Sequence, residues 1–299
     1  MKGKNAFGLA KYEISDIFED KHAVNALRDM FEDWLKYLEV NDAERNGLIE
    51  RTFDSIRNYS TKTGILDENL RREYVEMRII EKIRGRLKGR AEHIYSLIHP
   101  FLGNKILDHG CGDGSVAKYI SNRKKSKIIL SDVVDSKRRI EKVSNLPFYL
   151  IPVGTKLPFK DGEFDTSLLI TVLHHADDPL FELDEITRVT DGNIVIIESV
   201  YGVCMTETPH SELMRFPQLY QRFHKLTFEQ QRMYGTFLDW FLNKLILGNE
   251  INCPYNFNLP ENWEKIFEKR GLKVEYKQML GIDQMVTPEY HVLYVISNK

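Results

Sequence analysis

The chain has 299 residues, of which 42% are hydrophobic and 29% charged, a composition that excludes a disordered tail or a fibre. The 42 Lys and Arg residues nearly balance the 44 Asp and Glu residues, which excludes a chain-wide positive field of the kind that draws proteins onto nucleic acid or anionic lipid. No uncharged apolar run approaches the roughly 18 residues of a membrane helix, and no signal-peptide pattern opens the sequence. The three cysteines have neither metal-ligand nor disulfide-framework spacing. We therefore expect a soluble, cytoplasmic protein.

Residues 1–100 predict an N-terminal helical region. Apolar residues recur there at spacings of three and four, which is typical of amphipathic helices. The two clearest sets are Phe31, Trp34, Leu35 and Leu38, followed by Tyr74, Met77, Ile80, Ile83 and Leu87. No alternation of strands and helices appears before Lys105.

From Lys105 onward, short apolar runs alternate with helical segments. Five runs predict strands, at 106–107, 128–130, 148–151, 166–172 and 194–197. Fully apolar runs favour a parallel sheet that helices cover on both faces. Segments 273–276 and 290–296 predict two closing strands, with Gly281 and Pro288 in the connection between them. The predicted fold is a doubly wound, mostly parallel, seven-stranded α/β sheet, in a domain that covers residues 101–299.

A segment at about 202–262 interrupts this pattern with helical periodicity and many aromatic residues. It is too long for a simple crossover and predicts a helical cap inserted in the domain. Phe237, Trp240, Phe241 and Leu245 have the spacing of an ordinary amphipathic core. The alternative is that the remaining faces of these helices shape an apolar pocket for a small molecule.

A glycine-rich turn follows the first predicted strand. Asp108 precedes Gly110, Gly112 and Gly114, and a helical pattern begins directly afterwards. Glycine permits a tight turn and lets a ligand touch the backbone, and a helix N-terminus offers free amide donors. The turn therefore predicts a site for a small polar ligand at the carboxyl end of the strand.

The second predicted strand ends in Asp132, 24 residues after Asp108. An acid at that position is well placed to accept hydrogen bonds from two ribose hydroxyls. The glycine pattern is G-x-G-x-G, whereas a pyrophosphate is held by G-x-G-x-x-G. The sequence thus predicts a nucleoside ligand without phosphates.

Taken together, four ordered motifs closely resemble the class I S-adenosylmethionine-dependent methyltransferases, and within them the small-molecule, type 11-like group. They are DHGCGDG at 108–114 with Asp132, LPF at 157–159, FD at 164–165 and VLHHADDP at 172–179. The resemblance covers roughly residues 100–200, while the N-terminal region and the insertion carry none. It implies a Rossmann-like fold, S-adenosylmethionine as cofactor and S-adenosylhomocysteine as product.

The resemblance also assigns cofactor-binding positions. It places the three glycines beside the methionine part, the Asp108 carboxylate where it orients the loop, and the Asp132 carboxylate on the ribose. Where the family commonly has an acid for the adenine amino group, this chain has Val153. Either backbone amides or the Thr155 hydroxyl substitute in a loop that is built differently, or the selectivity for adenine is weaker. The complete predicted set is Asp108, Gly110, Cys111, Gly112, Gly114, Asp132, Val133, Val153, Gly154, Thr155, Ile170 and Thr171.

Methyl transfer from a sulfonium is an in-line displacement that requires alignment and exclusion of water, so no metal site is predicted. For a hydroxyl or protonated amine acceptor, a general base helps. The candidates for catalysis are His174, His175 and Glu198, with Tyr201 and His210 nearby in the sequence. The alternative is structural: the histidines bind backbone groups and Glu198 caps the next segment.

The leading hypothesis is methyl transfer to a small-molecule acceptor that is apolar, aromatic or anionic. Residues 71–90 carry eight basic and three acidic side chains. This segment forms either a solvated helix face or a binding surface for an anionic acceptor. One alternative is therefore an RNA or protein methyltransferase that uses this segment, although no nucleic-acid partner is expected from the overall charge. Another, suggested by Val153, is a cofactor-binding protein without transferase activity. No membrane partner is expected, and the sequence predicts no oligomeric state.

Overall fold

The computed structural model describes residues 6–7, 14–58, 68–135, 139, 143, 145–246, 251–283 and 288–298. Contacts between residues divide the chain into two compact units. Residues 1–86, 200–259 and 280–290 form the first, which we call the helical unit, and residues 87–199, 260–279 and 291–299 form the second, which we call the sheet unit. Each unit is thus assembled from segments that are far apart in the sequence.

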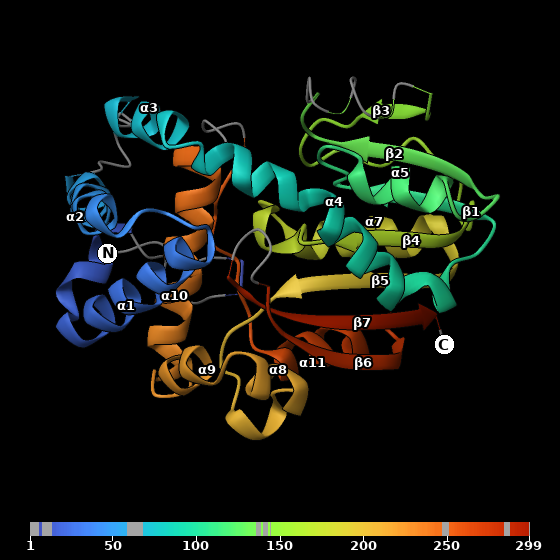
Figure 1. Ribbon diagram of the computed structural model, residues 1–299. Helices are drawn as coiled ribbons and strands as arrows, with labels where there is room; N and C mark the ends of the chain where they lie inside the picture. The colour runs from blue at the N-terminus through green and yellow to red at the C-terminus, as the bar shows by residue number, and fades with distance from the viewer. Residues whose placement is uncertain are drawn as a thin grey trace. The chain divides into compact units, whose positions relative to one another are not determined.

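The sheet has seven strands in the order β3-β2-β1-β4-β5-β7-β6 (Figure 1). The strands are β1 (Lys105–His109), β2 (Lys127–Asp132), β3 (Phe148–Leu150), β4 (Phe164–Ile170), β5 (Thr190–Ser199), β6 (Leu272–Ile282) and β7 (Tyr290–Asn298). The pairs among β1 to β5 are parallel, and β7 runs antiparallel to β5. This order confirms the predicted doubly wound, mostly parallel α/β fold.

One predicted boundary is wrong, because Gly281 lies within β6 and not in the connection that follows it. Beside this glycine, the Ile282 backbone N–H donates to the Tyr220 hydroxyl, at 2.7 Å. Gly281 has φ of +84°, and a Cβ there would collide with the same hydroxyl oxygen. Glycine is therefore required where the strand meets the Tyr220 side chain.

The inner parallel strands are buried as central parallel strands should be, whereas β3 at the edge of the sheet is partly exposed. Ile106 and Leu107 of β1 are fully inaccessible, and residues 194–197 of β5 are nearly so. The helices that the structure describes in the sheet unit are the part of α4 (Ile79–Ile98) from residue 87 onward, η2 (His99–Phe101), α5 (Ser115–Ser121), η3 (Leu173–His175), α7 (Pro179–Val189) and α11 (Pro260–Lys269). The Asp178 side chain caps α7 by accepting the backbone N–H groups of Leu180 and Phe181. The end of the VLHHADDP motif is thus a helix start.

Two further motifs have structural roles. The Asp165 carboxylate of the FD motif accepts the backbone N–H groups of Asn104 and Lys105, at 2.8 and 2.9 Å, and so aligns the start of β1. The LPF loop is held through its backbone, since the Leu157 N–H donates to Glu185 and the Arg188 guanidinium donates to the Leu157 carbonyl. These residues support the site without being part of it.

Aromatic side chains form the core of the helical unit. The Phe31 ring lies 5.3 Å from the Phe237 ring and 5.0 Å from the Phe241 ring, and the Phe241 ring also contacts Trp34 and Tyr74. Together with Trp240 and Leu245, the two insertion phenylalanines are inaccessible, which confirms the core interpretation of this set. The elements are η1 (Ile14–Glu19), α1 (Lys21–Tyr37), α2 (Asp42–Asn58), α3 (Glu68–Glu76), the part of α4 (Ile79–Ile98) up to residue 86, η4 (Met205–Glu207), α8 (His210–Arg215), α9 (Pro217–Phe223), α10 (Phe228–Trp240) and the π-helix η5 (Phe241–Ile246).

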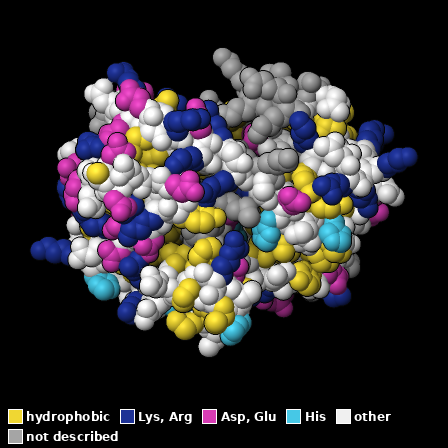
Figure 2. Space-filling model, in the orientation of Figure 1, with side chains coloured by type: hydrophobic (Ala, Val, Ile, Leu, Met, Phe, Trp, Pro, Cys, Tyr) yellow, Lys and Arg dark blue, Asp and Glu magenta, His cyan; other side chains and the backbone are white. Residues whose placement is uncertain are grey.

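Several basic side chains of segment 71–90 bind the protein itself. The Lys82 ammonium donates to the Leu38 and Glu39 carbonyls, at 2.8 and 2.9 Å, and Arg86 donates to the Tyr37 carbonyl, at 2.9 Å. These bonds satisfy carbonyls at the C-terminus of α1 that no helical N–H reaches. The face of the molecule drawn in Figure 2 mixes basic and acidic side chains. Among the residues that the structure describes, no helix combines the length and apolarity needed to cross a bilayer.

Candidate active site

The carboxyl ends of β1 to β5 and the loops that follow them carry every predicted cofactor-binding residue and the three leading catalytic candidates (Figure 1). All of these residues belong to the sheet unit. Tyr201 and His210 belong to the helical unit, where Tyr201 is buried and His210 opens α8. The carboxyl edge is where a doubly wound sheet is expected to bind its ligand.

The three glycines of the loop after β1 have positive φ angles of 69°, 53° and 71°, but they have different surroundings. A Cβ on Gly110 would lie 2.5 Å from Val172, and a Cβ on Gly114 would lie 2.5 Å from Val143. A Cβ on Gly112 would meet no described atom within 4 Å. The outer glycines therefore serve packing inside the protein, and Gly112 alone of the three leaves open space for a ligand against the backbone.

Asp108, at the end of β1, is buried, and its Oδ2 atom has no hydrogen-bond partner among the described residues. Burial, followed by the charges of Asp132 and Asp113, raises the pKa of Asp108 to about 7. An unpaired buried carboxyl oxygen is costly, so such an atom marks a place where a donor or a cation binds. This observation fits a ligand that carries an amino group.

Asp132, at the end of β2, is held in place by the backbone. Its Oδ2 atom accepts the Gly112 N–H at 2.8 Å, and its Oδ1 atom accepts the Val134 N–H at 3.0 Å. Each carboxylate oxygen has a second lone pair, so both can still accept a hydroxyl. Val133, beside it, is half exposed and offers an apolar surface. The same carboxylate thus ties down the glycine loop and presents two acceptors for a ribose.

The segment that replaces the family's adenine acid is a tight turn. The Thr155 backbone N–H and hydroxyl both donate to the Pro152 carbonyl, at 3.1 and 2.6 Å, and Gly154 takes a positive φ of 71°. The Thr155 hydroxyl proton is therefore used within the turn, and only its acceptor capacity remains. Val153 is 58% exposed, which leaves an apolar side chain where an acid was expected.

The end of β4 is held in an unusual conformation. Thr171 has φ of +56°, which a β-branched residue rarely adopts. Its backbone N–H donates to the Ile197 carbonyl at 2.7 Å, and its hydroxyl donates to the Ile170 carbonyl at 2.7 Å. Since Val172 packs against Gly110, the end of β4 and the glycine loop are fixed against each other. Strain of this kind is concentrated at functional sites.

His174 and Glu198 form a buried pair, with side chains 2% and 1% exposed. The His174 Nδ1 atom contacts the Glu198 carboxylate, which also accepts the Leu173 and Ser199 backbone N–H groups, at 2.9 Å each. Burial by itself would raise the pKa of Glu198, but the neighbouring His174 and these hydrogen bonds outweigh it and lower that pKa. The His175 ring lies 4.0 Å from the His174 ring.

A second buried histidine lies at the end of β1. The His109 Nδ1 atom is 2.8 Å from the Ser131 hydroxyl, and its Nε2 atom is 3.0 Å from the Glu182 carboxylate. The sequence interpretation missed these two partners, because nothing in their spacing marks them. Cys111, in the same loop, has a thiol pKa that burial and then the Asp108 and Asp132 charges raise, which fits a packing role.

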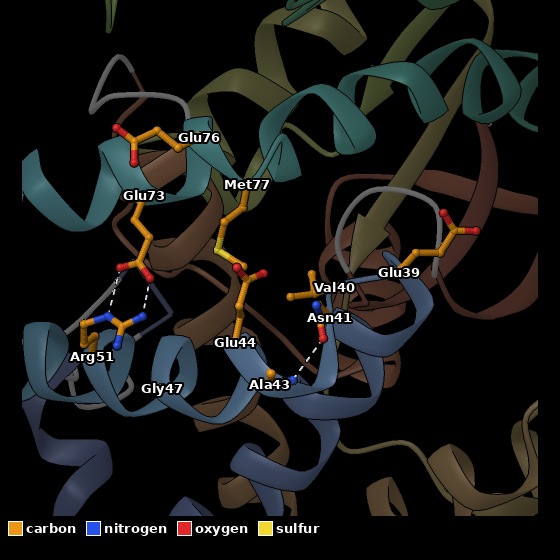
Figure 3. Close-up of a pocket in the computed structure, with 10 residues that line it drawn as sticks. All are labelled: Glu39, Val40, Asn41, Ala43, Glu44, Gly47, Arg51, Glu73, Glu76 and Met77. Carbon is orange, nitrogen blue, oxygen red and sulfur yellow. Dashed lines mark hydrogen bonds and ion pairs between the residues drawn. The ribbon is translucent and has the colours of Figure 1, made fainter.

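Apart from this edge, the helical unit has a pocket of about 590 Å³ (Figure 3). It lies among α2, α3 and the segment after α1, and the Arg51–Glu73 ion pair joins the two helices there. The lining residues are Glu39, Val40, Asn41, Ala43, Glu44, Gly47, Arg51, Glu73, Glu76 and Met77. None of them was predicted as a site residue.

Strand order defines a doubly wound α/β domain, and its carboxyl edge combines the unpaired Asp108 oxygen with open space at Gly112. Residues 107–196 match the family described as a methyltransferase domain. Residues 107–196 therefore carry a methyltransferase domain of the class I S-adenosylmethionine-dependent type, whose cofactor is S-adenosylmethionine. The predicted family, fold and cofactor are confirmed.

Two curated relatives and one solved structure illustrate the likeness. Arginine-hydroxylase NDUFAF5, mitochondrial, from Danio rerio is 28% identical over 113 residues, which cover 38% of this chain and 35% of that protein. O-methyltransferase resE from Aspergillus sclerotiorum is 32% identical over 130 residues, which cover 40% and 48%. This chain thus spans less than half the length of either relative. The structure of Burkholderia thailandensis 1,6-didemethyltoxoflavin-N1-methyltransferase, with bound 1,6-didemethyltoxoflavin and S-adenosylhomocysteine, is 13% identical, with a TM-score of 0.46 over 77% of this chain and 88% of that chain.

Proposed function

We propose that this protein transfers a methyl group from S-adenosylmethionine to a small-molecule acceptor by in-line displacement. The observation that carries the proposal is the arrangement of Asp108, Gly112 and Asp132 at the ends of β1 and β2. It combines an unpaired buried carboxyl oxygen, open space against the backbone and a fixed carboxylate. When bound, the cofactor supplies a methyl group activated by a sulfonium.

The residues of the chain have separate roles in this proposal. The Asp132 carboxylate accepts the ribose hydroxyls, the Asp108 carboxyl accepts the amino group, and Gly112 leaves room for the cofactor against the loop. Ile170 and Thr171 line the sulfur side, where fixed positions favour alignment of the reacting atoms. Val133 and Val153 offer apolar surface to the adenine in place of an acid.

The acceptor class is supported by the name of one relative and by the charge of the chain. An O-methyltransferase is among the matched proteins, which fits transfer to oxygen. The net charge of −2 and the use of Lys82 and Arg86 within the helical unit disfavour a nucleic-acid acceptor.

Calorimetry with S-adenosylmethionine and S-adenosylhomocysteine tests the cofactor site. Gly112→Val should weaken binding by at least about 100-fold, because the side chain enters the space left for the cofactor. Gly271→Val is the matched control: Gly271 also has a positive φ, of 72°, and open space around a Cβ, but it lies in the turn before β6. The control variant carries the same backbone strain and should bind normally.

A methyl-labelled cofactor incubated with fractionated metabolites then tests the reaction. Label in a small molecule supports the proposal, whereas label in RNA or protein, or oxygen insertion without methyl transfer, contradicts it. Equal affinity of the wild-type protein and Gly112→Val would show that the cofactor does not lie against this loop.

A further inference from the structure

The side chains of His109 and Ser131 join β1 to β2 at the carboxyl end of this strand pair. The two residues are paired in the parallel register, and the His109 Nδ1 atom lies 2.8 Å from the Ser131 hydroxyl oxygen. Both residues are buried. The contact therefore fixes the distance between the two strands at the point where each of them leaves the sheet.

The two carboxylates of the proposed cofactor site are the immediate neighbours of this contact. Asp108 precedes His109 in β1. Asp132 follows Ser131 in β2. Because successive side chains of a strand point to opposite faces of the sheet, the carboxylates lie on one face and the contact lies on the other. The contact thus supports the proposed cofactor site from the far side of the sheet.

Ser131 also holds the glycine loop through its backbone. Its carbonyl accepts the Gly110 and Cys111 N–H groups, at 2.8 and 3.2 Å. The next residue, Asp132, accepts the Gly112 N–H at 2.8 Å. Three consecutive amides of the loop are therefore bound by two consecutive residues of β2, so a rotation of the backbone at Ser131 would move the loop and the Asp132 carboxylate together.

A glutamate of α7 sets the orientation of the histidine ring. The Glu182 carboxylate lies 3.0 Å from the His109 Nε2 atom, and its side chain is 15% exposed. A carboxylate only accepts hydrogen bonds, so Nε2 carries the proton of this contact, and in the neutral ring Nδ1 accepts the Ser131 hydroxyl. Both ring nitrogens are thus bound within the protein, one to α7 and the other to β2.

We propose that His109 is a positioning residue for cofactor binding, which acts through Ser131 to hold the glycine loop and the Asp132 carboxylate in the arrangement that receives S-adenosylmethionine. This inference rests on the proposed methyltransferase function. His109 lies on the face away from the cofactor and takes no part in the chemical step. A ring that served packing alone would be replaced equally well by any side chain of similar size.

Two amide side chains separate the two contacts of the ring. The asparagine amide oxygen is as many bonds from the backbone as Nδ1, and the glutamine amide nitrogen as many as Nε2. His109→Asn therefore keeps the contact with Ser131 and loses Glu182, whereas His109→Gln keeps Glu182 and loses Ser131. Calorimetry of the full-length protein with S-adenosylhomocysteine should give an affinity within about threefold of wild type for His109→Asn, and a loss of at least about tenfold for His109→Gln.

Ser131→Ala removes the same contact from its other side and keeps the carbonyl that binds the loop. It should also weaken binding by at least about tenfold, and the double variant with His109→Gln should lose no more than either single variant, because both act on one contact. Ser167→Ala is the matched control. Ser167 of β4 is equally buried, and its hydroxyl lies 2.6 Å from that of Thr190. This variant should lower thermal stability and leave the affinity unchanged.

Turnover distinguishes positioning of the cofactor from damage to the whole site. With the acceptor found by methyl labelling, His109→Gln should raise the KM for S-adenosylmethionine by about tenfold and keep the KM for the acceptor within about threefold of wild type. His109→Asn should restore the first KM. A parallel rise of both KM values would contradict a role confined to the cofactor.

The outcomes separate the two proposals. Equal affinities of His109→Asn and His109→Gln, or unchanged affinity in Ser131→Ala, would overturn this inference and leave the methyltransferase function standing. Thermal denaturation shows whether each variant folds, and Ser131→Ala decides the inference if His109→Gln does not. A wild-type protein that binds no S-adenosylhomocysteine would contradict the methyltransferase function, and this inference with it.

Discussion

The sheet unit and the helical unit use their side chains in different ways. In the helical unit, aromatic rings such as Phe241 pack against one another, and Lys82 and Arg86 bind backbone carbonyls of the same unit. At the carboxyl edge of the sheet, Asp108 keeps an unpaired oxygen and Gly112 faces open space. The difference indicates that these side chains of the helical unit serve stability, whereas the strand ends retain an unpaired polar group and open space, as the proposed cofactor site requires.

Removing an aromatic ring from the helical core is the strongest test of this contrast. Phe241→Ala should lower the free energy of unfolding by about 3–5 kcal/mol, because the ring is fully buried among four others. Urea denaturation followed by tryptophan fluorescence measures the loss. Calorimetry at low temperature should give unchanged S-adenosylhomocysteine affinity, and a parallel loss of affinity would contradict the separation of roles.

Removing the carboxyl group of Asp108 tests the opposite case, a residue that destabilises the fold. The folded pKa of about 7 lies above the ordinary value of 3.8, so between these values the folded state binds more protons. The free energy of unfolding should therefore fall as pH rises through this window, by up to about 1.4 kcal/mol per pH unit. The stabilisation from the neutral carboxyl is complete below pH 3.8 and lost above pH 7.

Asp108→Asn removes this titration. Its denaturation curves at a series of pH values from 4 to 8 should show a smaller fall in stability than the wild-type curves. If the two proteins lose stability in parallel, Asp108 is ionised throughout and the buried oxygen has a partner in solution.

Two aspartates that bind backbone amides at opposite ends of β1 give a matched comparison. Asp132→Ala should weaken cofactor binding by about 1.5–3 kcal/mol, the value of a hydrogen bond to a charged group, measured by calorimetry. Asp165→Ala removes a carboxylate that also accepts two N–H groups, but at the amino end of the strand. It should lower thermal stability and leave affinity unchanged; equal losses of affinity would mean that Asp132 acts only through loop structure.

Local patterns predicted much of the fold and part of the candidate site. The apolar runs and the glycine turn specified strands and a backbone-lined loop, because burial and turn geometry depend on neighbouring residues. The separate roles of Gly110 and Gly112 could not be predicted from the sequence. Gly110 differs because it packs against Val172, which lies 62 residues further along the chain. The pairing of His174 with Glu198 likewise depends on strand register, which spacing in the sequence does not encode.

The smallest expected effect concerns the basic segment in the helical unit. Lys82 binds two carbonyls at the end of α1, whereas Arg78 forms an exposed ion pair with Glu81. Lys82→Met should lower the free energy of unfolding by about 0.5–1.5 kcal/mol, and Arg78→Met should change it by less than about 0.5 kcal/mol. Both variants should transfer methyl groups at the wild-type rate. If Lys82→Met instead leaves stability unchanged and raises the acceptor KM with a strong dependence on salt, the segment binds an anionic acceptor, and the helical unit takes part in recognition as well as in stability.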